Sequence, residues 1–250
     1  MMTSIENSKA VVTLGTAHFK EANEAVRAAL DATDTVELRD VFAQRYLGCG
    51  MPAGKRLEIH GVPGNDMACY MDGGSIEVFG NAQDQVANTM NHGDIVIHGR
   101  VGDAAGYGMR GGRILVRDGC GWRVGIHMKE FGAHRPVIVI GGDAGSFLGE
   151  YMAGGIIVLL GHAGPYVARG MHGGVIYLRH ALDECDVPDG VVQEPVDEQD
   201  RAILARLLGE YNAAFADDFR AADGHANASA TDEFVRLRPA TSRPYANLYT

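Results

Sequence analysis

Three glycines lie at the spacing that nucleotide-binding loops use. Gly106, Gly108 and Gly111 give the pattern G-x-G-x-x-G within the stretch GYGMRGG. In dinucleotide-binding folds this pattern follows a strand and opens a helix, whose N-terminus then faces the pyrophosphate. Here the pattern is followed by RILVR at 113–117, which carries no helix start signal and is typical of a strand. We therefore interpret these glycines as architecture and not as a phosphate-binding loop.

Three polar residues are spaced so that carboxylate chemistry must be considered. Asn65, Asp84 and Asp103 follow one another at intervals of 19 residues. If the chain repeats with that period, the two carboxylates stack about 4.8 Å apart and could bind calcium or share a proton. The alternative is structural, because Asn and Asp favour turn conformations. We favour this alternative, since the series is broken by the next equivalent residues, Trp122, Ser146 and Pro165.

Histidine and cysteine spacing predicts no metal centre. His60 and His98 are two periods apart with Phe79 between them, which is too far for joint ligation of one ion. Three further histidines are in non-equivalent positions, namely His127, His162 and His172. The scattered cysteines predict reduced, mostly buried thiols in a cytoplasmic protein; they are Cys49, Cys69, Cys120 and Cys185. We predict that this chain has no catalytic residue and itself binds no metal or cofactor.

A methionine repeat organises the chain. Its members are Met51, Met71, Met90, Met109, Met128, Met152 and Met171, at spacings of 20, 19, 19, 19, 24 and 19 residues. In six copies a glycine stands three residues later, at Gly54, Gly74, Gly93, Gly112, Gly155 and Gly174. Each copy has one short strand pattern, from LEIHG at residue 57 to VIYLR at residue 175. The period predicts a right-handed parallel β-helix of about seven coils, with the methionines stacked inside it. A methionine-lined metal or substrate channel is the alternative.

The repeat divides the chain into three segments. Residues 1–35 are expected to form an N-terminal strand and helix cap, with the helix over residues 18–31. Residues 36–181 form the β-helix, so the core is all-β with small α-helical flanks. Residues 182–250 are expected to form a C-terminal helix with Asp197 as its N-cap, then a linker and an extended arm.

Composition excludes two classes of partner. The formal net charge is −10 and no basic tract occurs, which argues against nucleic acid and against an anionic membrane surface. No apolar run reaches the 18 residues that a membrane span needs. Glycine is abundant, at 34 of 250 residues, roughly twice the average usage of about 7%.

The repeated corners resemble a known domain. The stretches GRVGDAAGYGMRGGRILVR, WRVGIHMKEF and GDAGSFLGEYMAGGIIVLLG are similar to the G-x-G-x-G domain, the C-terminal β-helix of the glutamate synthase large subunit. The stretch YLGCGMPAGKRLEIHG and the closing RPYANLY resemble the stand-alone subunits of glutamate synthase and N-methylglutamate synthase type. The resemblance covers roughly residues 36–180.

This resemblance implies a structural subunit of a flavin-dependent complex involved in glutamate and nitrogen metabolism. An amidotransferase-like subunit and an FMN-binding, glutamate-synthase-like subunit would be its partners, and FMN and an iron–sulfur cluster would reside in a partner. One alternative is the related β-helix subunit of a formylmethanofuran dehydrogenase or formyltransferase/hydrolase complex. Another is a self-sufficient carbohydrate-active β-helix enzyme.

Two basic segments predict a partner interface. The 24-residue spacing inserts a loop at 129–136 that brings Lys129, His134 and Arg135 together. The arm at 234–249 supplies Arg236, Arg238, Arg243 and Tyr245. Arginine and tyrosine are enriched at interfaces, and an extended arm gains order only by docking. The alternative is that the arm folds back over the coils of its own chain.

Overall fold

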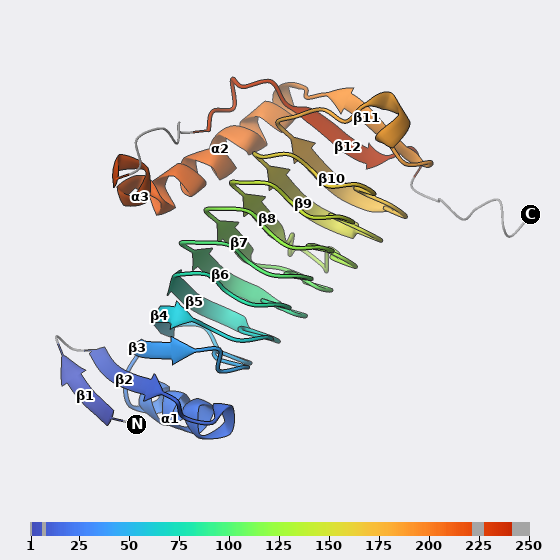
Figure 1. Ribbon diagram of the computed structural model, residues 1–250. Helices are drawn as coiled ribbons and strands as arrows, with labels where there is room; N and C mark the ends of the chain where they lie inside the picture. The colour runs from blue at the N-terminus through green and yellow to red at the C-terminus, as the bar shows by residue number, and fades with distance from the viewer. Residues whose placement is uncertain (1, 7–8, 222–227, 242–250) are drawn as a thin grey trace, which may run out of the picture.

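The strands of this protein stack in chain order along one continuous sheet. The computed structural model describes residues 2–6, 9–221 and 228–241. Twelve strands follow the order β1-β2-β3-β4-β5-β6-β7-β8-β9-β10-β12-β11, and Figure 1 shows them climbing as a staircase. The parallel members are β2 (Lys9–Gly15), β3 (Thr35–Phe42), β4 (Arg56–Val62), β5 (Asp72–Phe79), β6 (His92–Ile97), β7 (Arg113–Val116), β8 (Val137–Ile140), β9 (Ala153–Leu159) and β10 (Gly173–Leu178). The stacked parallel coils confirm the predicted solenoid, with about eight turns.

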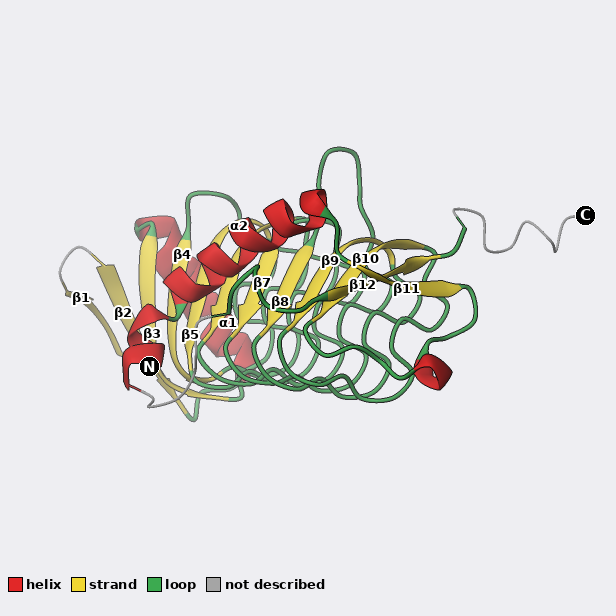
Figure 2. Ribbon diagram, turned by 90° about the horizontal axis from the view of Figure 1, so that it is seen from above, coloured by secondary structure: helices red, strands yellow, loops and turns green. Residues whose placement is uncertain are grey.

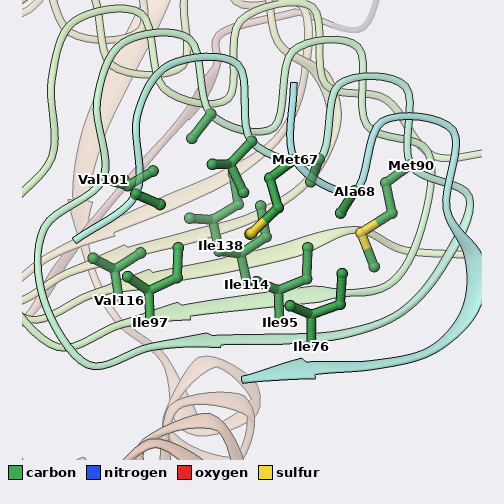
Figure 3. Packing of buried hydrophobic residues seen from close by; sticks show 14 of the residues in the cluster. Met67, Ala68, Ile76, Met90, Ile95, Ile97, Val101, Ile114, Val116 and Ile138 are labelled. Atoms are coloured by element: carbon green, nitrogen blue, oxygen red, sulfur yellow. The ribbon is translucent and has the colours of Figure 1, made fainter. Parts of the chain in front are cut away.

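The pairing register stacks identical side chains on one another. Ile76 pairs with Ile95, and Ile95 pairs with Ile114. The column continues through Ile138 and Ile157. Figure 3 shows these isoleucines pointing from successive strands into the interior, with Met90 entering from the opposite corner. Because the side-chain period of a strand is two, this register keeps one face of every strand in the core.

The methionine ladder is buried, as the sequence predicts. All seven methionines have exposed fractions of at most 2%: Met51, Met71, Met90, Met109, Met128, Met152 and Met171. They belong to one hydrophobic cluster that runs the length of the solenoid. The ladder therefore fills the core, and the interpretation as a lined channel is wrong.

Each coil turns on residues with left-handed backbone angles. In the Met109 coil these are Ala104, Gly106 and Gly108, with φ of 54°, 70° and 57°. The same three places, five, three and one residues before the methionine, have positive φ in the other coils. Gly106 and Gly108 are thus turn residues, and β7 follows the pattern as a strand. Because no helix opens there, the structure excludes the dinucleotide-loop interpretation.

The Asn and Asp column is structural as well. Oδ1 of Asn65 accepts from the backbone N–H of Asp84 at 3.4 Å, and Oδ1 of Asp84 accepts from that of Asp103 at 2.9 Å. Asp103 in turn accepts from the backbone N–H of Trp122 at 2.8 Å. Each side chain therefore satisfies a turn donor of the next coil. These contacts confirm the structural alternative for this column.

The N-terminal flank closes one end of the solenoid. Helix α1 (Phe19–Ala32) buries Ala22, Val26 and Leu30 in the main core, and it covers the end of the stack in Figure 1. Strand β1 (Met2–Glu6) pairs antiparallel with β2. The predicted helical cap is therefore present.

The C-terminal flank covers the outer face of the sheet. Helix α2 (Glu198–Ala214) begins at Asp197, which forms a capping box with Asp200, as expected for that N-cap. Its residues Leu204, Leu207 and Leu208 pack on outward-facing side chains of β7 to β10 in a second hydrophobic cluster, and Figure 2 shows the helix lying across the strands. The short elements η1 (Glu184–Asp186) and α3 (Ala216–Ala221) flank it.

Part of the arm docks on its own chain. Strand β12 (Val235–Pro239) pairs antiparallel with both β10 and β11 (Val191–Pro195). These residues of the arm therefore fold back over the coils of their own chain, which was the alternative to docking on a partner. Arg243 and Tyr245 lie outside the described residues. Because β2 pairs with β3 and β12 with β10, the sheet runs on through the boundaries at residues 35 and 181.

Candidate partner-binding surface

The described residues offer no metal centre. Within residues 2–6, 9–221 and 228–241, no group of three His, Cys, Asp or Glu side chains is placed to hold an ion. His60 and His98 sandwich Phe79, with ring centroids 4.6 and 4.9 Å apart. His98 also contacts Asp218 and Glu77, at 2.6 and 3.0 Å. The two histidines therefore belong to a stacked outer face, as their spacing predicts.

One face of the turns carries exposed aromatic side chains. We call it the aromatic stripe and define it as Tyr107, Trp122, His127, Phe147, Tyr151 and Tyr166. Trp122 and Tyr166 each have 54% of their surface exposed. Exposed large aromatic side chains that gather on one face mark sites of interaction.

Five of the six rings form two ladders that run along the solenoid axis, and Trp122 stands outside both ladders. In the first, His127 contacts the ring of Tyr107 at 5.8 Å and stacks on Tyr151 at 5.3 Å. In the second, Phe147 stacks on Tyr166 at 4.9 Å, and the guanidinium of Arg123 lies 4.7 Å from the Phe147 centroid. Arg123 also pairs with Glu150, whose carboxylate is 3.2 Å away. The stripe thus combines flat apolar rings with fixed charges.

The repeat positions these rings. Phe147 and Tyr166 occupy the place five residues before the methionine, and His127 and Tyr151 occupy the place one residue before it. All four have positive φ, between 53° and 67°. Glycine tolerates such angles freely, whereas any other residue pays roughly 1–2 kcal/mol. The chain therefore holds aromatic side chains at positions where glycine would stabilise the fold more.

The two ladders meet at a hollow near the C-terminal end of the solenoid. A cavity of about 590 Å³ is lined by Tyr151, Tyr166 and Arg169, and on its other side by Cys185, Pro188 and Asp189. Arg169 lies 5.8 Å from the centroid of Tyr166. Aromatic walls with one cation and two carboxylates, those of Asp186 and Asp189, suit an amphipathic side chain of a partner.

The inserted loop forms a tight turn beside the coils. The backbone N–H and C=O of Phe131 and His134 bond to each other at 3.1 Å, and the exposed residues include Lys129 and Arg135. His134 lies 3.0 Å from Nε2 of His92, whose Nδ1 contacts Asp72 at 2.5 Å. Arg135 pairs with Glu130 at 2.7 Å. The loop is thus fastened to the coils, and its outer side is exposed.

The arginines of the arm are engaged within the chain. Arg236 bonds to Asp200 at 2.6 Å, to Asp197 at 2.7 Å and to Glu194 at 3.1 Å. Arg238 holds the other side of Glu194 at 2.7 Å. Hydrogen bonds from Arg238 and Arg236 keep the pKa of Glu194 below its usual value.

The two segments of the predicted interface lie on different coils. Strands β9 and β10 separate β12 from the loop, which precedes β8. A role of Lys129, His134, Arg135, Arg236 and Arg238 at a partner stays a prediction. The sequence did not lead to a prediction of the stripe, although His127 and Tyr151 occupy a place of the repeat that is glycine in other coils, at Gly50, Gly108 and Gly170.

A β-solenoid with a packed core, turn-capping polar columns and an exposed aromatic stripe is the structural class of this chain. Comparison with known proteins gives the family. The GXGXG motif family matches residues 21–239, and this chain belongs to that family, which includes the glutamate-synthase-type domain. A protein of Methanocaldococcus jannaschii, described as uncharacterized, is 34% identical over 247 residues and is aligned over 93% of each chain. None of the helices in the described ranges is long and apolar enough to cross a membrane.

Proposed function

We propose that this chain is a non-catalytic structural subunit of a glutamate-synthase-type, flavin-dependent oxidoreductase complex, of the glutamate or N-methylglutamate synthase type. In this role it holds an amidotransferase-like subunit and an FMN-binding subunit in a fixed relative position in the cytoplasm. The observation that carries the proposal is the aromatic stripe on a rigid, fully packed rod. Membership of the GXGXG motif family supports the type of complex.

The energetics of the stripe favour a docking role. Aromatic and arginine side chains dominate interface energies because each buries a large area when a partner covers it. In the free chain, Trp122 and Tyr166 stay half exposed while the backbone beneath Tyr166 has a φ of 67°. A partner that covers these rings would recover the hydrophobic free energy that the isolated chain forgoes.

The donor set of this chain does not fit an iron–sulfur cluster. Such a cluster needs about four converging cysteine thiolates. Cys49 and Cys69 lie on neighbouring coils, whereas Cys120 is buried three coils further along and Cys185 is exposed near the C-terminal flank. The proposal therefore assigns FMN and the iron–sulfur cluster to a partner subunit.

A capture experiment tests the proposal. Affinity-tagged wild-type chain, expressed in its native host, should retain an amidotransferase-like and an FMN-binding chain, both identified by mass spectrometry. The double variant Trp122→Ala/Tyr166→Ala should lose at least about tenfold of this yield, as truncation of hot-spot aromatics predicts. Tyr70→Ala is the matched control, because Tyr70 is 59% exposed and has positive φ. It occupies the same repeat place as His127 and Tyr151 but lies on an earlier coil, which is not part of the stripe.

Two results would overturn the proposal. Recovery of amidohydrolase-like and formyltransferase-like chains would assign the protein to a formyl-transferring complex. Recovery of the expected partners by the double variant at the wild-type level would show that the stripe does not hold them. Carbohydrate-cleaving activity of the isolated chain would support the third function, which needs the Asp84 and Asp103 carboxylates that now cap turns.

A further inference from the structure

Two cysteines lie next to each other on the first coils, far from the aromatic stripe. Cys49 and Cys69 each stand two residues before a ladder methionine, so they are equivalent residues of adjacent coils. Two inter-coil hydrogen bonds flank them, from the N–H of Ala68 to the C=O of Leu47 at 2.8 Å and from the N–H of Gly50 to the C=O of Cys69 at 2.9 Å. Neighbouring coils stack about 4.8 Å apart, which lies within the Cα separation that a disulfide spans.

The two thiols differ in access. Cys49 is partly exposed and lines a cavity of about 190 Å³ between α1 and the first coils, together with Arg27 and Lys55. Cys69 is buried beneath it. Lys55 is paired with Asp34 at 2.8 Å. The lining also includes the carboxylate of Asp31. Small reagents can reach Cys49 from this cavity, while Cys69 is reached through Cys49.

The electrostatics favour a thiolate at the accessible position. The hydrogen bond from Cys69, together with the positive charge of Arg27 and against the effect of burial, lowers the pKa of Cys49 to about 6. The same hydrogen bond and burial raise the pKa of Cys69. A reactive thiolate beside a protonated second thiol is the arrangement of redox-active cysteine pairs.

We propose that Cys49 and Cys69 form a redox-active dithiol that exchanges with low-molecular-weight disulfides such as oxidised glutathione. The Cys49 thiolate attacks one sulfur of the disulfide, forms a mixed disulfide and releases one thiolate. That thiolate takes the proton of Cys69, and the Cys69 thiolate then attacks the Sγ of Cys49 and releases the second thiolate, which takes from water the proton that Cys49 gave up on ionising. The chain loses two electrons and two protons in total, and one disulfide is reduced to two thiols. This site is independent of the proposed function.

The chain supplies its own controls. Cys120 is buried, and burial raises its pKa to about 12. Cys185 is exposed and is best removed with Cys185→Ser, so that the parent protein for the test keeps three thiols.

The test follows the products of glutathione disulfide treatment by intact-mass and peptide mass spectrometry. The Cys185→Ser parent should lose two hydrogens and yield a peptide that links Cys49 to Cys69. Addition of Cys69→Ser should trap one glutathionyl group on Cys49, and addition of Cys49→Ser should abolish both products. Circular dichroism checks that each variant keeps its fold.

The pH profile gives a second, independent readout. The rate of alkylation of Cys49 by iodoacetamide should level off above about pH 7, because the thiolate is then fully formed. An ordinary thiol, with a pKa of about 8.5, continues to gain rate up to about pH 9.5. Arg27→Gln should move the midpoint of the profile to higher pH. The proposal fails if Cys49 stays reduced in the parent, or if its profile equals that of an ordinary thiol.

Discussion

The Cε methyl group of Met90 occupies the space that a Cβ atom on Gly112 would need, since the two would lie 2.6 Å apart. The same relation joins Met71 to Gly93 and Met152 to Gly174. Five of the seven ladder methionines thus pack over the corner glycine of the next coil, and the coil after Met109 has Phe131 in place of that glycine. The methionines and the corner glycines of the repeat therefore contact each other between neighbouring coils.

We expect Gly112→Ala to destabilise the protein by about 3 kcal/mol or more. The added Cβ would meet Met90 and the backbone carbonyl of Gly93 at 2.7 Å, in a residue with φ of 80°. Gly132→Ala is the matched control, because Gly132 has φ of 61° but open space around it. It should cost about 1 kcal/mol, the strain alone. Urea denaturation measures both values, and equal costs would contradict the packing argument.

A substitution in the Asn and Asp column should lower the stability of the protein without changing the binding of a ligand. Asp84→Ala removes the acceptor for the backbone N–H of Asp103 and should cost about 1–2 kcal/mol. Asp183→Ala is the control, because Asp183 precedes η1 without a capping hydrogen bond. Titration with calcium in a calorimeter should give the same result for wild type and for Asp84→Ala. Loss of a measurable calcium signal in the variant would revive the carboxylate-site interpretation.

The N-terminal cap predicts a pH dependence. Lys9 contacts Glu37 at 2.5 Å and Glu58 at 2.7 Å. The hydrogen bond from Lys9 lowers the pKa of Glu37; burial raises the pKa of Glu58, but its bonds to Lys9 and Arg56 outweigh that effect. The stability from these carboxylates is present above about pH 4.5 and is lost as the pH falls through their lowered pKa values.

Lys9→Met should therefore cost about 2 kcal/mol at pH 7, and its deficit relative to wild type should shrink below about pH 4.5. Lys55→Met provides the comparison, because its partner Asp34 is exposed and such pairs contribute little. Denaturation curves of wild type, Lys9→Met and Lys55→Met between pH 3 and pH 8 measure these differences in stability. A deficit that is constant over this range would rule out the charged network as its cause.

Substitution of Arg236 distinguishes a role in the stability of this chain from a role in binding a partner. Asp200 accepts from Arg236 at 2.6 Å and from the hydroxyl of Tyr177 at 2.7 Å. Arg236→Ala leaves this buried carboxylate short of a donor and should cost about 2–3 kcal/mol. Arg206→Ala, which loses one exposed contact to Glu210, should cost less than about 0.5 kcal/mol. Unchanged thermal stability of Arg236→Ala combined with lost partner capture would instead place Arg236 at an interface.

The sequence predicted the parts of the fold that depend on periodicity. The spacing from Met51 to Met171 gave the coils, because each repeat must bury its own inward residues against the next. Asp197 marked the start of α2 because its capping box is local in sequence. The helical cap over residues 18–31 followed from Phe19, Ala22, Val26 and Leu30 in the same way.

Other features depend on contacts that sequence spacing does not encode. Nothing in the residues around Arg236 specifies that β12 enters between β10 and β11, because an extended segment can pair with any free sheet edge. The stripe was missed because exposure at Trp122 and Tyr166 depends on turn angles. The pairing of Cys49 with Cys69 was hidden by the 20-residue spacing of their coils, one residue longer than the common period.

The antiparallel strands at the two ends of the sheet have a consequence for length. Because β1 stands at one end of the sheet and the β12–β11 pair at the other, the number of coils between them sets the distance between the ends. Two proteins seated on different rungs of the solenoid are then held apart by a whole number of steps of about 4.8 Å. Adding or deleting one 19-residue coil would therefore move an attachment point along the solenoid by one such step.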